Sequence, residues 1–148
     1  MATRTAHAHT PAVGPLTDEE LLGMDAADYM NERQLAFFRR RLLELKAEIA
    51  ANQSETAEHL KETEVAADPA DRATREEEQA IELRARDRER KLLRKIDQAL
   101  ARIEDGRYGF CDETGEPIGL PRLLARPTAM LSVEAQERRE RRERSYGG

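Results

Sequence analysis

The sequence is poor in cysteine and in aromatic residues. Trp is absent, aromatic residues make up 4% of the 148 positions, and Cys111 is the only cysteine. A single cysteine excludes an intrachain disulfide and is typical of a protein from a reducing compartment. No run approaches the ~18 apolar residues of a membrane span, and the first fifteen residues lack the apolar core of a signal peptide. We therefore expect a cytoplasmic protein without a membrane attachment.

Charged residues are abundant instead. Asp, Glu, Lys and Arg make up 37% of the chain, and the net charge is −5. This composition favours long solvated helices over a round globule. The negative balance also predicts that the chain does not bind DNA directly. At this length we expect one small domain, and we expect it to be a monomer.

The chain divides into segments by composition. Pro11 and Pro15 lie in a polar N-terminal stretch that we expect to be disordered. Thr17 and Glu20 form a capping-box pattern, which predicts a short helix directly after this tail. The expected segments are a disordered tail over residues 1–15, a short helix and linker over 16–30, a coiled-coil hairpin over 31–106 with its tip near 66–73, and a globule with a terminal helix over 107–148.

A long helix is predicted to begin at Asn31, an N-cap residue that is followed three positions later by Gln34. Apolar residues then recur in steps of three and four, which is typical of a coiled-coil seam. These residues are Leu35, Phe38, Leu42, Leu45 and Ile49. The same steps lead on to Asn52, Thr56 and His59, so we expect the packing to weaken towards the far end.

A second long helix is predicted after Asp68, because Pro69 ends the preceding helix at or before that residue. Asp68 suits the N-cap, Pro69 the first helical position and Asp71 the third. The helix is predicted to end at Gly106. Its expected seam residues are Ile81, Leu92, Ile96, Ala99 and Ile103. The short connection between the two helices predicts an antiparallel hairpin, and hence a fold dominated by α-helix.

The segment after the hairpin contains several glycines and prolines, which predicts a compact, loop-rich globule. The candidates for its core are Tyr108, Phe110, Ile118, Leu120, Leu123, Leu131 and Val133. A terminal helix is expected to follow. Three pairs of opposite charge lie four residues apart in it, namely Glu134–Arg138, Glu137–Arg141 and Glu140–Arg144.

Two charged groups are candidates for function, and each also has a simpler structural explanation. Asp68 and Asp71 suit a helix start, and the residues alone favour this role over chemistry. A stripe of basic residues is spaced four, three and four apart, and therefore shares one side of the second helix. It consists of Arg84, Arg88, Lys91 and Lys95. Such a stripe is either a solvated surface with ion pairs or a binding surface for acidic protein or phosphate.

Four motifs occur in a fixed order along residues 28–135, namely "YMNERQLAFFRR", "DPADRATREEEQAIELRARDRERKLLRKI", "YGFC" and "IGLPRLLARPTA". Together they resemble the DksA family of bacterial regulators that bind RNA polymerase. The resemblance implies a short N-terminal helix, a long antiparallel coiled coil and a small C-terminal globule. It also implies that the coiled coil enters the secondary channel of RNA polymerase and destabilises open complexes at promoters such as those of ribosomal RNA, in synergy with guanosine tetraphosphate (ppGpp).

The resemblance also assigns roles to individual residues. The tip motif D-x-x-D-x-A, which the family brings near the active centre, matches Asp68, Asp71 and Ala73. Contacts with the rim of the polymerase channel fall on Arg84, Arg88 and Lys91. The ppGpp site falls on Leu92, Lys95 and Arg126. A further basic position of that site is Gln136 here, which cannot pair with a phosphate charge, and Arg138 and Arg139 are the candidates to replace it.

The usual globule of the family holds zinc through a C-x2-C-x17-C-x2-C pattern. The corresponding positions of this chain are Cys111, Thr114, Ser132 and Ala135. Three of the four thiolates are missing, and neither a neutral hydroxyl nor a methyl group is a good zinc donor. The histidines, His7, His9 and His59, are distant in sequence. The chain thus resembles the cysteine-poor members of the family, and we predict a degenerate zinc finger without structural zinc.

Three other functions remain as alternatives. A plain coiled-coil scaffold or adaptor requires good packing along its length, and the polar tip argues against it. A hydrolase with paired carboxylates is disfavoured because the sequence lacks a glycine-rich phosphate loop and a metal cluster. A transcript-cleavage factor shares the slender shape and the acidic tip, but holds a metal through its tip carboxylates. We favour a regulator of RNA polymerase that is not an enzyme.

Overall fold

The computed structural model describes residues 14–62 and 68–147, with the backbone alone for 54–62. Most of the expected tail, positions 66 and 67 of the expected tip, and the three histidine side chains lie outside this part. The described residues form helices and no strand, in the order α2 (Asp18–Leu22), the 3-10 helix η1 (Ala26–Asp28), α3 (Glu32–Glu62), α4 (Pro69–Asp105), α5 (Leu120–Ala125) and α6 (Val133–Gly147). Among these helices, none combines the length and the apolar composition needed to cross a membrane.

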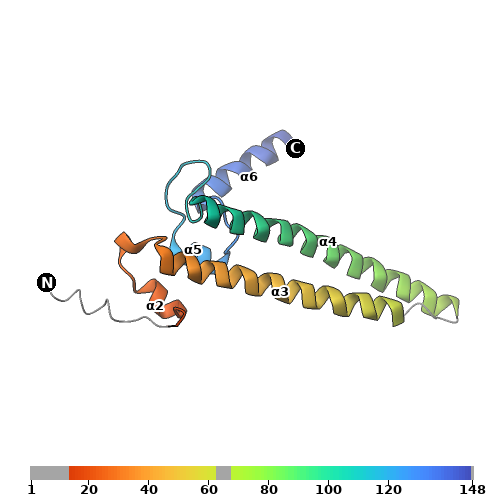
Figure 1. The fold of residues 1–148 in the computed structure, drawn as a ribbon. Coiled ribbons are helices and arrows are strands. Elements are labelled where there is room, and N and C mark those ends of the chain that lie inside the picture. Colours follow the sequence, from red (N-terminus) through yellow and green to blue (C-terminus); the bar gives the residue numbers. More distant parts are fainter. Residues whose placement is uncertain (1–13, 63–67, 148) are drawn as a thin grey trace.

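The long helices α3 and α4 lie side by side and extend away from the other elements (Figure 1). They contain 31 and 37 residues, which corresponds to about 46 and 55 Å at about 1.5 Å per residue. Ion pairs across the hairpin join Arg39 to Glu104 at 2.6 Å and Lys46 to Asp97 at 2.9 Å. The predicted helical fold with a long antiparallel hairpin is confirmed. We call this hairpin the finger.

The helix ends follow the residues that were expected to cap them. Thr17 and Glu20 form a complete capping box at α2, and Gly106 ends α4 in the left-handed conformation, with φ of 79°. At the start of α3, the backbone N–H of Gln34 donates to Asn31 Oδ1 at 2.9 Å. The Gln34 side chain accepts from the N–H of Met30, one residue earlier than a capping box requires.

The core lies at the base of the finger, where four helices meet. Its fully buried side chains come from α2, α3, α4, α5 and the loop after α4; the largest of them are Tyr108, Phe38, Leu21, Leu42, Ile96, Leu123 and Gln34. The Phe38 and Tyr108 rings pack with their centroids 5.5 Å apart. This contact joins the first helix of the finger directly to the C-terminal globule.

The seam of the finger differs from the prediction in its distal half. Ile96 and Ala99 are buried as expected, but Ile81 is 57% exposed and Leu92 is 37% exposed, so their assignment to the seam was wrong. Half-buried residues in steps of four and three occupy the α4 side instead: Arg75, Gln79, Glu82, Arg86, Glu89 and Leu93. The register is set by the packed base, and continuing its 3.5-residue period leads to these polar positions rather than to Ile81.

Most of the expected globule core is confirmed. Tyr108, Leu123 and Leu131 are buried, and the intermediate group consists of Phe110, Ile118 and Leu120. Val133 is 45% exposed, because it begins α6 at the surface, and its assignment to the core was wrong. The three charge pairs expected within α6 do not form among the described residues. Arg139 and Arg142 of α6 pair with Glu113 of the globule instead, at 3.3 and 3.6 Å.

Candidate functional site

The tip of the finger begins α4 with two exposed aspartates. Asp68 has extended backbone angles, φ of −118° and ψ of 162°, and its carboxylate accepts a hydrogen bond from the Asp71 N–H at 2.9 Å. Pro69 follows at the first helical position. The Asp71 carboxylate makes no hydrogen bond to another described residue, and Ala73 is also exposed. Asp68 therefore caps the helix, whereas the carboxylate of Asp71 is available to a partner.

The predicted basic stripe lies on a single exposed face of α4. We call Arg84, Arg88, Lys91 and Lys95 the basic face. All four are exposed. Lys91 pairs with Asp87 at 3.4 Å in an exposed contact, which contributes at most about 1 kcal/mol. The other three form no ion pair with any residue that the structure describes. The basic face thus carries positive charge that the protein itself does not neutralise.

The residues assigned to a nucleotide site come from separate elements. Leu92 and Lys95 lie on α4, and Arg126 is exposed at the end of α5. The Gln136 side chain donates to Glu140 at 2.8 Å. Arg139 is paired with Glu113, which leaves Arg138 as the freer of the two candidate replacements.

The four degenerate zinc positions do come together in the globule. Cys111 is buried in a small cluster with Leu131 and Ala135, and the Ala135 N–H donates to Ser132 Oγ at 3.2 Å. This cluster offers one thiol, two neutral hydroxyls and a methyl group, whereas structural zinc requires four thiolate or imidazole donors. Within the described ranges, no group of three or more His, Cys, Asp and Glu side chains is arranged to hold a metal. These residues do not fit zinc.

Cys111 occupies an environment that favours its thiolate. Burial by itself opposes ionisation, but the Thr114 hydroxyl and the backbone N–H groups of Ser132, Thr114 and Glu113 donate towards the sulfur. The net effect lowers the pKa of the Cys111 thiol to about 6. Hydrogen bonds donated to the sulfur therefore favour its anionic form.

A buried arginine fastens the globule to the end of α4. The Arg102 side chain is 7% exposed and pairs with Asp112 at 3.0 Å. It also donates to the carbonyl oxygens of Arg107 at 3.2 Å and Phe110 at 2.9 Å. The role of Arg102 was not predicted from the sequence. Its position beside the Ala99 and Ile103 seam positions was the available signal, but a charge there is more often solvated.

Two tyrosines make hydrogen bonds that hold the globule in place, and none of these three bonds was predicted. The Tyr29 hydroxyl donates to the Gly109 carbonyl at 2.6 Å and accepts from the Gly119 N–H at 2.9 Å. The Tyr108 hydroxyl donates to the Pro127 carbonyl at 2.7 Å. Burial raises the pKa of both tyrosines, so both remain neutral donors at physiological pH. The bonds of Tyr29 link the segment before α3 to the globule, and the bond of Tyr108 joins two loops within the globule.

Gly109 permits a close approach between the linker and the globule. Its φ is 89°, and a Cβ atom built on it would lie 2.7 Å from Cγ and Sδ of Met30. Met30 itself has φ of 56°. A side chain at position 109 would therefore displace Met30 and disturb the start of α3.

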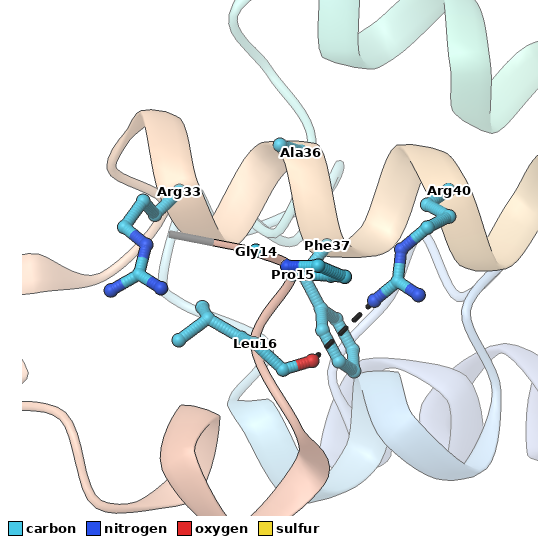
Figure 2. Close-up of a pocket in the computed structure, with 7 residues that line it drawn as sticks. All are labelled: Gly14, Pro15, Leu16, Arg33, Ala36, Phe37 and Arg40. Atoms are coloured by element: carbon cyan, nitrogen blue, oxygen red, sulfur yellow. Dashed lines mark hydrogen bonds between the residues drawn. The ribbon is translucent and has the colours of Figure 1, made fainter. Parts of the chain in front are cut away.

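A cavity of about 280 Å³ lies beside the first turns of α3. Figure 2 shows Arg33 and Arg40 on either side of it, with Arg40 donating to the Leu16 carbonyl at 3.4 Å. The described lining residues are Gly14, Pro15, Leu16, Arg33, Ala36, Phe37 and Arg40. They include no carboxylate, histidine or cysteine, so they form no acid–base pair. The cavity gives no support to the hydrolase alternative.

Comparison with known proteins yields matches along most of the chain. The family model described as DnaK suppressor protein DksA, N-terminal domain, matches residues 34–103. The model described as prokaryotic dksA/traR C4-type zinc finger matches residues 106–141. The two matches meet close to Gly106, where α4 ends.

Individual proteins are similar over the same region. RNA polymerase-binding transcription factor DksA of Caulobacter vibrioides (strain NA1000 / CB15N) is 65% identical over 119 residues, which are 80% of this chain and 84% of that protein. The protein of that name from Escherichia coli (strain K12) is 44% identical over 122 residues, or 82% and 81% of the two chains. The solved structure of transcription factor DksA2 from Pseudomonas aeruginosa has a TM-score of 0.78 and 51% identity, and covers 86% of this chain and 99% of that chain.

We expect a metal chelator to leave the stability of the purified protein unchanged, because the four degenerate positions supply a single thiolate. A variant with Thr114→Cys, Ser132→Cys and Ala135→Cys is expected to bind zinc and to become chelator-sensitive. Its metal site would contribute up to about 10–16 kcal/mol of binding free energy. Thermal unfolding with and without chelator measures both effects. Unfolding of the wild type by chelator would contradict the prediction.

We expect the Cys111 thiolate to make stability depend on pH. Its pKa in the folded protein is about 6, below the ordinary thiol value of about 8.5. The thiolate therefore stabilises the fold fully above about pH 8.5, and this contribution disappears as the pH falls through about 6. The free energy of unfolding of the wild type, minus that of Cys111→Ser, should rise over this window in urea titrations. A difference that is constant with pH would show that no thiolate forms.

Proposed function

The chain belongs to the DksA family, and on this premise we propose that it is a transcription regulator that binds RNA polymerase. The similar proteins of Caulobacter vibrioides and Escherichia coli are named RNA polymerase-binding transcription factors. The observation that carries the proposal is the combination of an anchored finger, an exposed acidic tip and a positive face that the protein leaves unneutralised.

The shape of the finger suits entry into a narrow channel. Two paired helices are about 20 Å across, since each has a diameter of about 10–12 Å with its side chains. The finger enters the secondary channel of the polymerase and brings Asp71 close to the active centre. A carboxylate placed there repels nucleic-acid phosphate or competes for the catalytic cation. Either effect destabilises the open promoter complex.

The basic face supplies the charge for docking. Arg84, Arg88 and Lys91 contact acidic residues on the rim of the channel. Exposed charges of this kind mainly accelerate association and orient the partners. The net charge of −5 keeps the rest of the protein from binding nucleic acid through bulk electrostatics. The protein acts as a cytoplasmic monomer without direct DNA binding.

We propose in addition that the protein shares a site for ppGpp with the polymerase. Lys95 and Arg126 are exposed and supply two cations for phosphate, while Leu92 supplies an apolar contact. Arg138 is available to act where Gln136 stands. Synergy with ppGpp follows if the nucleotide bridges the two proteins.

The alternatives receive less support. A transcript-cleavage factor requires tip carboxylates free to hold a metal, but Asp68 is engaged as the helix cap. A coiled-coil scaffold requires an apolar seam along its length, whereas the distal seam here contains Arg75, Glu82 and Glu89. We therefore propose a regulator without catalytic activity and without zinc.

Neutralising the tip should abolish the effect on transcription without unfolding the protein. Asparagine caps a helix about as well as aspartate, so the Asp68→Asn, Asp71→Asn double variant should keep its stability within about 0.5 kcal/mol. Its shortening of the open-complex lifetime at a ribosomal RNA promoter should be lost. The matched control is Glu134→Gln, Glu137→Gln, which removes the same charge from α6. If the tip variant kept its full effect on transcription, the two aspartates would serve only to cap the helix.

Removing one cation of the nucleotide site should weaken the response to ppGpp. Lys95→Ala or Arg126→Ala should raise the ppGpp concentration for half-maximal effect about tenfold, since a hydrogen bond to a charged group contributes about 1.5–3 kcal/mol. The effect measured without ppGpp should persist. Arg141→Ala, which changes an exposed arginine of α6, serves as the control. An unchanged ppGpp titration would refute the assignment.

A further inference from the structure

An exposed isoleucine lies in the distal half of the finger. Ile81 is 57% exposed, although its neighbours on α4 are mostly charged. Isolated exposed apolar residues are common and need no explanation by themselves. The surroundings of Ile81 are what distinguish it.

Ile81 continues the basic face towards the tip. Ile81, Arg84, Arg88, Leu92 and Lys95 follow one another in steps of three, four, four and three, so they share one side of α4. Leu92 is 37% exposed. Ile81 and Leu92 are separated by about 16 Å, given about 1.5 Å per residue. Two apolar side chains thus bracket cations that have no partner within the described part of the chain.

The opposite flank of the same helix has a different character. Leu83 is 56% exposed, and two residues along a helix it lies about 200° around the axis from Ile81. On its flank Asp87 pairs with Arg90 at 3.3 Å, and Asp97 pairs with Lys46 at 2.9 Å. That flank therefore carries acidic as well as basic side chains, and both of its aspartates take part in ion pairs. The molecule therefore offers two equally exposed apolar residues in contrasting electrostatic settings.

We propose that Ile81 is an apolar anchor that docks into the polymerase, on a surface that is acidic opposite Arg84 and Arg88. This inference rests on the proposed function and adds to it a specificity-determining contact. Binding energy concentrates in a few residues buried near the centre of a contact, where the exclusion of water also strengthens nearby ion pairs. An acidic surface of the polymerase is complementary in charge to the basic face, and it therefore favours docking of Ile81 over docking of Leu83.

The position of Ile81 also defines what the contact does. It lies thirteen residues after Asp68, or about 20 Å behind the tip at about 1.5 Å per residue. A socket for Ile81 inside the channel sets how deeply the finger enters. It therefore sets where the Asp71 carboxylate stands relative to the active centre.

The test compares Ile81→Ser with Leu83→Ser in the full-length protein, by competition for binding to RNA polymerase. Ile81→Ser should bind about tenfold more weakly, because burial of an isoleucine side chain lowers Kd by a factor of about 10 to 100. Leu83→Ser should remain within about twofold of the wild type. Thermal unfolding should be alike for the two variants, since both positions are exposed.

Salt dependence separates the anchor from the charges. Ile81→Ser should weaken binding by the same factor at low and high salt, whereas Arg88→Ala should mainly flatten the salt dependence. The proposed anchor would be wrong if Ile81→Ser bound as tightly as the wild type, or if both serine variants weakened binding equally. Neither result would contradict the proposed function. A wild type that does not bind polymerase at all would overturn both.

Discussion

The contact between the tilted rings of Phe38 and Tyr108 is the one on which the rest of the molecule depends. The two rings are buried and 5.5 Å apart, and they join α3 to the globule that follows α4. The finger is about 55 Å long, so the position of its tip is well defined only when its base is rigid. The surrounding core, with Leu21, Ile96 and Leu123, provides that rigidity through close packing, in which each large buried side chain contributes about 1.5–3 kcal/mol.

Packing quality falls along the finger from base to tip. Apolar seam residues such as Leu42 and Ile96 are replaced distally by half-buried charged ones such as Arg86 and Glu89. Burying charges contributes little net stability, so the distal part depends on the base and on helix capping by Asp68. The base of the finger is therefore more tightly packed than its distal half.

Many small interactions hold the globule together. Arg102, Tyr29 and Tyr108 together make several buried hydrogen bonds to backbone carbonyl groups, and each such bond contributes about 1 kcal/mol net. A structural metal stabilises a fold through four ligands at one point. These hydrogen bonds instead stabilise the globule at several points along the chain. The hydrogen-bond donors of Thr114, Ser132 and Glu113 gather around the Cys111 sulfur.

The sequence alone determined where α2 and α4 begin and where α4 ends, because the caps Thr17, Asp68 and Gly106 act through local backbone chemistry, whereas α5 was not predicted. It also determined that the residues at the zinc positions are unsuited to the metal, because ligand identity is a property of single side chains. The register of the distal finger, the exposure of Ile81 and the burial of Arg102 were decided only by the tertiary structure. Burial depends on which distant segments meet, and the pairing of α3 with α4 is set at the base, far along the chain from the residues whose exposure it controls.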